Sequence, residues 1–220
     1  MKRTIMNIMK MLIVLFAALN IFALGNAYVT VVEAAETKAE DFQYEETDTG
    51  LTITGYIGTE TDVVIPSEIN GKKVTGIGDL AFSACGLTSI EIPASVTSIG
   101  DGAFCACPNL KSIVVSVGNK NYKSIDGMVY SYDMTNFVAC PGGKRGELVI
   151  QKGVTHIRDY ACTGCGNITS IKFPSGVTHI GYCSFSNCNS ITSISFPEGL
   201  ISIKDYAFVG CLLYTSDAAD

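Results

Sequence analysis

Hydrophobic and polar residues alternate in one phrase that recurs along the chain. It reads LTSIEIP at 87–93, ITSIKFP at 168–174 and ITSISFP at 191–197. Alternation with period two predicts a short strand with one buried face, and the proline ends the strand because it has no N–H to donate. In the first of these copies we expect Ile90 and Ile92 to point inward and Glu91 outward.

Each phrase is followed by V-T-x-I or a close variant and then by A-F-x-x-C, whose spacing suits one helical turn. Weaker copies of the whole unit begin at Val63 and Leu148, and the later copies are 23 residues apart. One unit cannot bury its own apolar residues. Stacked at about 4.8 Å, successive units would bury columns of Ile, Val, Phe and Cys as one continuous core. The pattern therefore predicts a solenoid.

The stretches LTSIEIPASVTSIGDGAF, ITSIKFPSGVTHIG and ITSISFPEGLISIKDYAF resemble the BspA-like subclass of leucine-rich repeats. The resemblance covers residues 63–210. It implies a mainly β solenoid with short helical turns, a right-handed curved stack of about 23-residue coils. It also implies a bacterial protein that is secreted or displayed at the cell surface for adhesion, and that binds a ligand without catalysis.

Two stretches depart from the repeat. Residues 117–147 interrupt the period, and Asp126-Gly127 lies between apolar segments in the way typical of a hairpin turn, so this stretch is expected to be an island insertion within a repeat. Residues 35–62 are expected to form an acidic leader and then a β-hairpin, around Asp48-Thr49-Gly50, that caps the open first coil.

The two ends of the chain carry further signals. Basic residues precede the apolar run 11–24, which predicts a signal peptide over 1–34 with cleavage after Ala27 or Ala34. An uncleaved anchor is the alternative, although this run is shorter than the roughly 20 residues that a spanning helix needs. The last ten residues, CLLYTSDAAD, can be back-translated to a sequence that resembles a transposon-derived sequencing adapter, so residues 211–220 are expected to be a non-native tail. A genuine short tail is the alternative.

The charge balance limits the possible partners. The chain carries a formal charge of −6, and loss of the predicted signal peptide with Lys2, Arg3, Lys10 and Glu33 would bring it to −8. An acidic chain without a basic patch is not expected to bind nucleic acid, or to insert into or bind an anionic membrane.

The nine cysteines raise the question of disulfides, thiols or metal. A structural cysteine ladder is expected at one repeat position: Cys85, Cys107, Cys165, Cys188 and Cys211. Disulfides among the others, Cys105, Cys140, Cys162 and Cys183, are the alternative. The C-x-x-C pair of Cys162 and Cys165 is interpreted as a core substitution, because Cys162 takes a position held by Phe in other units. No metal or cofactor is expected, since the Cys105 and Cys107 pair lies several coils away.

The two histidines, His156 and His179, occupy the same place in V-T-H-I, 23 residues apart. Stacking would bring them together, but two ligands make a weak metal site, and an exposed ladder is the preferred interpretation. The sequence contains no Ser-His-Asp order with a nucleophile elbow, no phosphate-binding glycine loop and no paired carboxylates in a pocket pattern. No enzyme is expected.

The candidate binding residues lie on the outward side of the strands and in the island. They are Val64, Glu91, Val114, Val149, Lys172 and Ser195 along the stack, with Tyr122, Tyr130 and Tyr132 in the island. The outward row varies while its neighbours repeat, so it can carry specificity without disturbing the core. We expect an extracellular protein or glycan to bind this concave strand face. The alternatives are solvated filler, a spacer displaying a missing C-terminal domain, or the targeting arm of a truncated surface enzyme.

Overall fold

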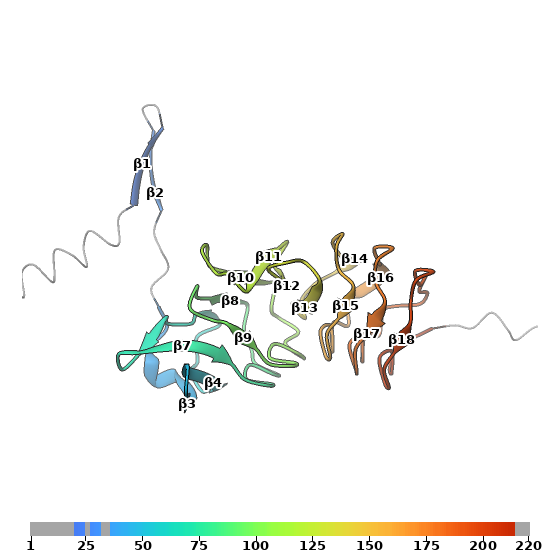
Figure 1. Cartoon of the computed structure of the whole chain (residues 1–220), viewed down its shortest axis with the longest axis horizontal. Coiled ribbons are helices and arrows are strands. Elements are labelled where there is room, and N and C mark those ends of the chain that lie inside the picture. Colours follow the sequence, from blue (N-terminus) through green and yellow to red (C-terminus); the bar gives the residue numbers. More distant parts are fainter. Residues whose placement is uncertain (1–19, 25–26, 32–35, 214–220) are drawn as a thin grey trace, which may run out of the picture. The chain divides into compact units, whose positions relative to one another are not determined.

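The computed structural model describes residues 20–24, 27–31 and 36–213, and the chain divides into two compact units, 1–35 and 36–220 (Figure 1). In the first unit, β1 (Asn20–Leu24) and β2 (Ala27–Val31) form an antiparallel hairpin. The rest of the predicted signal peptide, and residues 214–220 of the suspected tail, lie outside the described residues. No helix in the described segments has the length and apolar character to cross a membrane.

One set of parallel strands, here called the first ladder, is built from the I-x-I phrases. Its strands are β5 (Asp62–Val64), β8 (Ser89–Ile92), β10 (Ser112–Val115), β14 (Gly146–Val149) and β16 (Ile168–Lys172). They pair in the orders β5-β8-β10 and β14-β16. The predicted orientation is confirmed in β8, where Ile90 and Ile92 are buried, Glu91 is half-buried, and Pro93 follows the strand.

A second ladder is built from the V-T-x-I segments. At one end β4 (Gly50–Tyr56), β7 (Lys72–Ile77) and β9 (Ser98–Ile99) pair in parallel. At the other end the order is β13 (Asn136–Ala139), β15 (His156–Ile157), β17 (His179–Ile180) and β18 (Ser202–Ile203). His156 pairs with His179 and His179 with Ser202, which confirms the 23-residue coil. The short β6 (Glu68–Ile69) pairs with β7 and closes the longer turn of the first coil.

The predicted N-terminal hairpin is present and extends the second ladder. After one 3-10 turn, η1 (Ala39–Asp41), β3 (Phe42–Thr47) pairs antiparallel with β4, and β4 then pairs with β7. Phe42, Leu51 and Ile53 are buried against the first coil. The hairpin therefore covers apolar side chains that the first coil could not bury alone.

The A-F-x-x-C segments form hydrogen-bonded turns and not regular helix. In the first copy Ser83 N–H donates to the Leu80 carbonyl and Cys85 N–H to the Phe82 carbonyl, both with i to i+3 spacing. Leu80 and Ala84 have φ values of 56° each. This left-handed backbone stops the turn from propagating as a helix.

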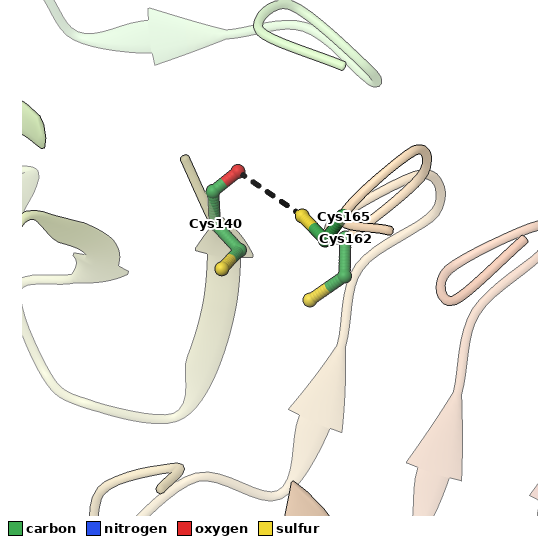
Figure 2. A group of neighbouring side chains, drawn as sticks. All are labelled: Cys140, Cys162 and Cys165. Carbon is green, nitrogen blue, oxygen red and sulfur yellow. Dashed lines mark hydrogen bonds between the residues drawn. The ribbon is translucent and has the colours of Figure 1, made fainter. Parts of the chain in front are cut away.

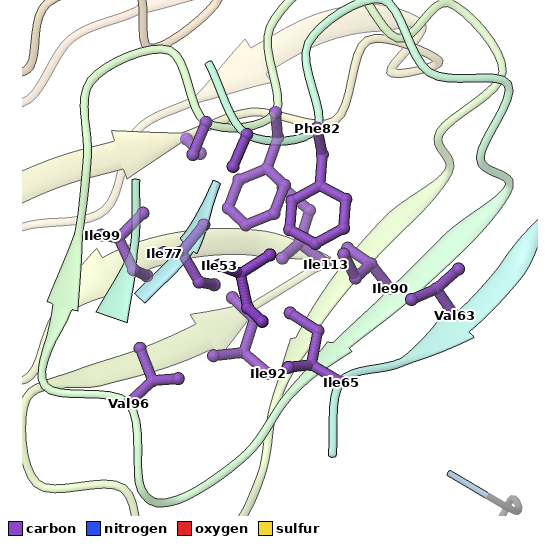
Figure 3. Close-up of a cluster of buried hydrophobic side chains, with 14 of the residues drawn as sticks. Ile53, Val63, Ile65, Ile77, Phe82, Ile90, Ile92, Val96, Ile99 and Ile113 are labelled. Atoms are coloured by element: carbon purple, nitrogen blue, oxygen red, sulfur yellow. The ribbon is translucent and has the colours of Figure 1, made fainter. Parts of the chain in front are cut away.

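The core consists of two clusters of buried side chains. Figure 3 shows part of the first, in which columns of Ile and Val from both ladders meet Phe82. The second cluster begins with Met128 and Tyr130 of the island and continues through Phe185 to Ile191. Fully burying one such side chain contributes about 1.5–3 kcal/mol, so the stack gains stability with each coil.

The island separates the two clusters. Its β11 (Tyr122–Ile125) and β12 (Met128–Ser131) form the predicted hairpin, with Asp126 at φ 52° and Gly127 at φ 76°, as a type I′ turn requires. In the described residues β9 has no strand partner on the side away from β7.

Side chains bridge this break in the second ladder. The Tyr122 hydroxyl accepts from Ile99 N–H at 3.0 Å, and Arg158 Nη1 donates to the Ile99 carbonyl at 2.8 Å. The backbone groups that a neighbouring strand would pair are thus satisfied by two side chains.

The last copy of the phrase differs from its prediction. Residues 191–197 form no strand, and Phe196 is 42% exposed. This segment is the final one of the first ladder in the described chain, so it has a neighbouring coil on one side only. A strand with a partner on one side keeps a row of unpaired groups, which weakens its ladder.

Candidate binding surface

The predicted outward row is aligned in two separate parts. Val64 pairs with Glu91 and Glu91 with Val114, while Val149 pairs with Lys172. Val114, Val149 and Lys172 are exposed, but Glu91 is half-buried and accepts from the Ser116 hydroxyl at 2.9 Å. Ser195 is exposed and lies outside any strand. The strands therefore place five of the six residues on one face, in a row of three and a row of two.

The three island tyrosines lie in different environments. Tyr132 is 52% exposed, with Lys123 Nζ 4.6 Å from the centre of its ring. Tyr122 is half-buried, and its hydroxyl accepts a hydrogen bond from Ile99 N–H. Tyr130 is 0% exposed and packs on Phe137 at 5.2 Å, so the prediction that it contacts a ligand is wrong. The reason is that β12 lies between β11 and β13 and is covered on both faces, unlike a protruding loop.

The second ladder carries a shallow groove of about 290 Å³ that the sequence reasoning did not identify as a site. Its outward row is Asn136, His156, His179 and Ser202, aligned by the pairing of β13, β15, β17 and β18. Charged side chains border this row: Asp101, Arg158, Asp159 and Lys204. Any ligand lying along the groove would meet polar groups from four successive coils.

The two histidines stack face to face, with ring centres 4.5 Å apart and planes 5° apart, as their spacing predicted. Each Nδ1 lies 2.8 Å from the hydroxyl of the preceding threonine, Thr155 or Thr178. Each threonine hydroxyl also lies within hydrogen-bond distance of a carbonyl, that of Thr135 for Thr155 and that of Thr155 for Thr178. The direction of each hydroxyl–Nδ1 bond depends on the imidazole tautomer, and among the described residues Nε2 is the ring nitrogen without a hydrogen-bond partner.

The charges at the edge of the groove are paired. Arg158 Nη2 lies 2.6 Å from Asp101 Oδ1, and Lys204 Nζ lies 3.1 Å from both oxygens of Asp159. Asp159 Oδ1 also accepts from Tyr182 N–H at 2.8 Å. These contacts fix the positions of the charged groups before any ligand arrives, which lowers the ordering cost of binding.

A tyrosine ladder follows the groove residues on the same coils. Tyr160 and Tyr182 meet edge to face at 5.5 Å, and Tyr182 and Tyr206 at 5.7 Å. Tyr206 is 61% exposed. The signal in the sequence was the recurrence of Tyr directly after Asp159, Gly181 and Asp205, which the reasoning from the strands alone did not use.

Comparison with known proteins assigns the repeat. The family model for the BspA type leucine-rich repeat region matches in six copies, over residues 61–142 and 146–218. The chain belongs to this family. It is thus a leucine-rich repeat protein, a class consistent with protein binding. A search of the curated proteins found no match.

Several solved leucine-rich repeat structures are similar. A leucine-rich repeat protein of T. pallidum is 28% identical over 81% of this chain and 69% of its own, with a TM-score of 0.44. One from Bacteroides ovatus is 24% identical over 80% and 51%, with a TM-score of 0.48. The pneumococcal vaccine antigen PcpA is 21% identical over 82% and 60%, with a TM-score of 0.44. The chain therefore spans 51% to 69% of the length of these three proteins.

The repeat cysteines of this leucine-rich repeat chain act as hydrogen-bond donors between coils. Sγ of Cys107, Cys188 and Cys211 lies 2.9, 3.3 and 3.3 Å from a carbonyl oxygen in the preceding coil. Burial raises the pKa of Cys107 to about 12, so its sulfur stays protonated and can donate. Cys85 is half-buried, and all nine cysteines, which lie in residues 36–213, are unpaired thiols.

One position of the repeat, here called the aromatic slot, departs from phenylalanine in two successive coils. Phe82 N–H donates to the Ala103 carbonyl of the next coil, and Phe185 N–H to that of Ala207. Cys140 and Cys162 make the same bond, to Ala161 and Ser184. Cys162 therefore lies in the slot as predicted, and the island residue Cys140 occupies the slot of the coil before it.

These two cysteines meet Cys165, and we call the three the thiol cluster. Their sulfurs all lie within 4.8 Å of one another, and all three side chains are buried (Figure 2). The sequence reasoning expected no metal because the Cys105 and Cys107 pair lies several coils away, and it did not consider Cys140, which the structure places beside the C-x-x-C pair. Aligning the island's A-C-P-G-G with A-F-x-x-C would have placed Cys140 beside Cys162.

The three thiols influence each other's protonation. The Cys162 and Cys165 thiols can donate to the Cys140 sulfur, which lowers the pKa of Cys140 below that of an ordinary thiol. Burial, followed by the interaction with Cys140, raises the pKa of Cys162 well above the ordinary value.

Proposed function

We propose that this leucine-rich repeat protein is exported and displayed outside the cell, where it binds an extracellular protein or a glycan without catalysis. Export is supported by the apolar segment 11–24 behind its basic residues. Binding is supported by the groove and by the adjoining tyrosine ladder, which has one tyrosine on each of three successive coils. The edge-to-face tyrosine ladder on the solenoid surface is the observation that carries the proposal.

The chemistry of this surface suits recognition. Tyrosine provides a large, rigid contact area together with a hydroxyl, and it is enriched among residues that dominate interface energies. The histidine Nε2 atoms and the paired charges provide directional contacts beside it. A partner with both aromatic or apolar and hydrogen-bonding groups, a protein loop or a sugar ring, fits this combination.

The groove is arranged for binding polar groups. Its threonine hydroxyls contact both the neighbouring histidine rings and backbone carbonyls. Its charged side chains are paired with one another. This arrangement of groups that already have partners supports binding without catalysis.

The experiment compares two surfaces of the same protein. The full chain is screened against immobilised extracellular-matrix proteins and a glycan array, and its dissociation constant for each hit is measured. We expect Tyr182→Ala and Tyr206→Ala to weaken binding by roughly tenfold or more each, as expected for aromatic anchors. Glu91→Ala and Lys172→Ala, on the first ladder, are the matched controls and should leave binding unchanged.

Two outcomes would contradict the proposed binding surface. If the Glu91 and Lys172 variants lose binding while the tyrosine variants keep it, the ligand uses the outward row predicted from the sequence. If the chain binds nothing in either panel, the spacer or the targeting-arm alternative replaces the binding proposal. Beads coated with the full chain test adhesion, and they should cluster with the cells or matrix that carry the identified ligand.

A further inference from the structure

We propose that Cys140, Cys162 and Cys165 form a binding site for one soft, thiophilic metal ion of the Cu(I) or Zn(II) class. The site lies inside the second core cluster and is separate from the proposed binding surface. It would tie the island coil to the coil that follows it, because Cys140 belongs to the first and the other two ligands belong to the second.

The repeat itself marks this site as different from every other coil. Phe82 and Phe104 stack at 5.7 Å with planes 16° apart, and Phe185 and Phe208 stack at 5.2 Å with planes 2° apart. Between these two pairs, the aromatic slot holds two cysteines in succession. Each replaces a ring by one sulfur atom, and the repeat cysteine at position 165 adds a third sulfur at the same level of the stack.

The sulfur positions fit one ion. A metal–sulfur bond of about 2.3 Å places the three sulfurs of a trigonal site about 4.0 Å apart. The three sulfurs here already lie within 4.8 Å of one another, so small rotations of the side chains suffice to close the site. The cluster is fully shielded from solvent, with exposures of 3%, 1% and 0%, so water does not compete for the ion.

The donor set selects the class of ion. Thiolates favour soft ions such as Cu(I) and Zn(II) over Mg(II) or Ca(II). Among the described residues, the group of possible ligands contains three cysteines and no His, Asp or Glu. Three sulfurs can satisfy Cu(I), whereas Zn(II) in structural sites takes four ligands.

The test uses the purified full chain, kept reduced and freed of metal by a chelator. Cu(I) is titrated against a chromophoric Cu(I) chelator, Zn(II) against a chromophoric zinc chelator, and native mass spectrometry gives the stoichiometry. We expect one ion per chain. Each sulfur that binds as a thiolate releases its proton, so affinity should rise with pH.

The variants test the assignment of the ligands. Cys162→Phe restores the residue of neighbouring coils and should weaken binding by at least about 100-fold, more than the loss of an outer-shell contact. Cys140→Ser should have a similar effect. Cys107→Ser is the control, since Cys107 is an equally buried repeat cysteine in the other core cluster, and it should bind as the parent does. Circular dichroism of each variant checks that the solenoid is retained.

Three results would overturn the proposal. The first is that neither ion binds at one per chain. The second is that Cys162→Phe, folded by circular dichroism, binds as tightly as the parent, or that Cys107→Ser loses binding to the same degree. The third is a disulfide within the thiol cluster of the protein as isolated, found by thiol counting and peptide mapping, which would make the cluster a covalent cross-link.

Discussion

The side chain of Asn119 fastens the island to the coil before it. It is 3% exposed, and its Nδ2 donates to the carbonyls of Pro93 and Val96 at 3.1 and 2.9 Å. Its Oδ1 accepts from the N–H groups of Asn121 and Tyr122, both at 2.9 Å. The amide side chain thus donates two hydrogen bonds and accepts two. These bonds join the residues that follow β8 to the start of β11.

Replacing this residue should destabilise the protein strongly. Each hydrogen bond contributes about 1 kcal/mol net, so Asn119→Ala should cost about 4 kcal/mol. Asn119→Asp keeps the shape and the two accepted bonds but turns a carboxylate oxygen toward two carbonyl oxygens. The charged form is disfavoured there, so the pKa of the new carboxyl should be raised in the folded state. The variant should then recover stability, relative to the parent, as pH falls through that raised pKa, and the gain is complete below about pH 4.

Urea unfolding followed by circular dichroism measures the loss, under reducing conditions. Because repeat proteins can unfold in parts, amide hydrogen exchange at Asn121 and Tyr122 provides the local measurement. Asn121→Ala is the matched control, since Asn121 is exposed, and it should stay within about 0.5 kcal/mol of the parent. If Asn119→Ala costs less than about 1 kcal/mol, or if Asn119→Asp is as stable as the parent at neutral pH, the role assigned to this amide is wrong.

Three other predictions concern the break, the aromatic slot and the repeat cysteines. Arg158→Ala and Tyr122→Phe each remove a hydrogen-bond partner of Ile99. In urea unfolding, Arg158→Ala should lower the free energy of unfolding by about 1–3 kcal/mol and Tyr122→Phe by about 1 kcal/mol. An unchanged free energy of unfolding would mean that water replaces these partners. Phe185→Ala should cost about 3–5 kcal/mol, and a smaller cost would mean that the stack collapses around the site. Burial raises the pKa of Cys107 to about 12, so its contribution to stability is complete below the pKa of a free thiol and falls as pH approaches 12. Mass spectrometry after brief alkylation of the native protein at pH 8 should find Cys107 unmodified, and rapid modification would contradict this pKa.

The solenoid could be predicted because successive repeat units place the same residue types at the same positions. His156 and His179 were 23 residues apart in identical contexts, and the structure stacks their rings at 4.5 Å. Ile90 and Ile92 alternate with Glu91, and the first two are buried. A repeat gives several independent readings of one backbone geometry, so an error in one copy is corrected by the others.

What could not be predicted lies where the repeat is interrupted. Tyr130 was expected to contact a ligand because aromatic residues supply anchor energy at interfaces, yet β12 is an interior strand of a sheet and buries it. The contact of Cys140 with Cys162 depends on how the island rejoins the stack. The other repeat units have no such insertion, so their pattern does not predict this contact. The tyrosine ladder was missed for another reason. Its residues lie on turns whose left-handed backbone at Tyr160 and Tyr206 the strand periodicity does not describe.

The interruption also relates the fold to the proposed binding surface. Apart from Asn136 in the island and Asp101 before it, the groove lies on coils after the island, and Asp101 pairs with Arg158. Arg158 also bonds the Ile99 carbonyl, so the same side chain closes the broken ladder and forms one wall of the groove. Loss of Arg158 should therefore weaken ligand binding and the coupling between the two core clusters together. Loss of Tyr122's hydroxyl, which bridges the break without lining the groove, should weaken only the coupling.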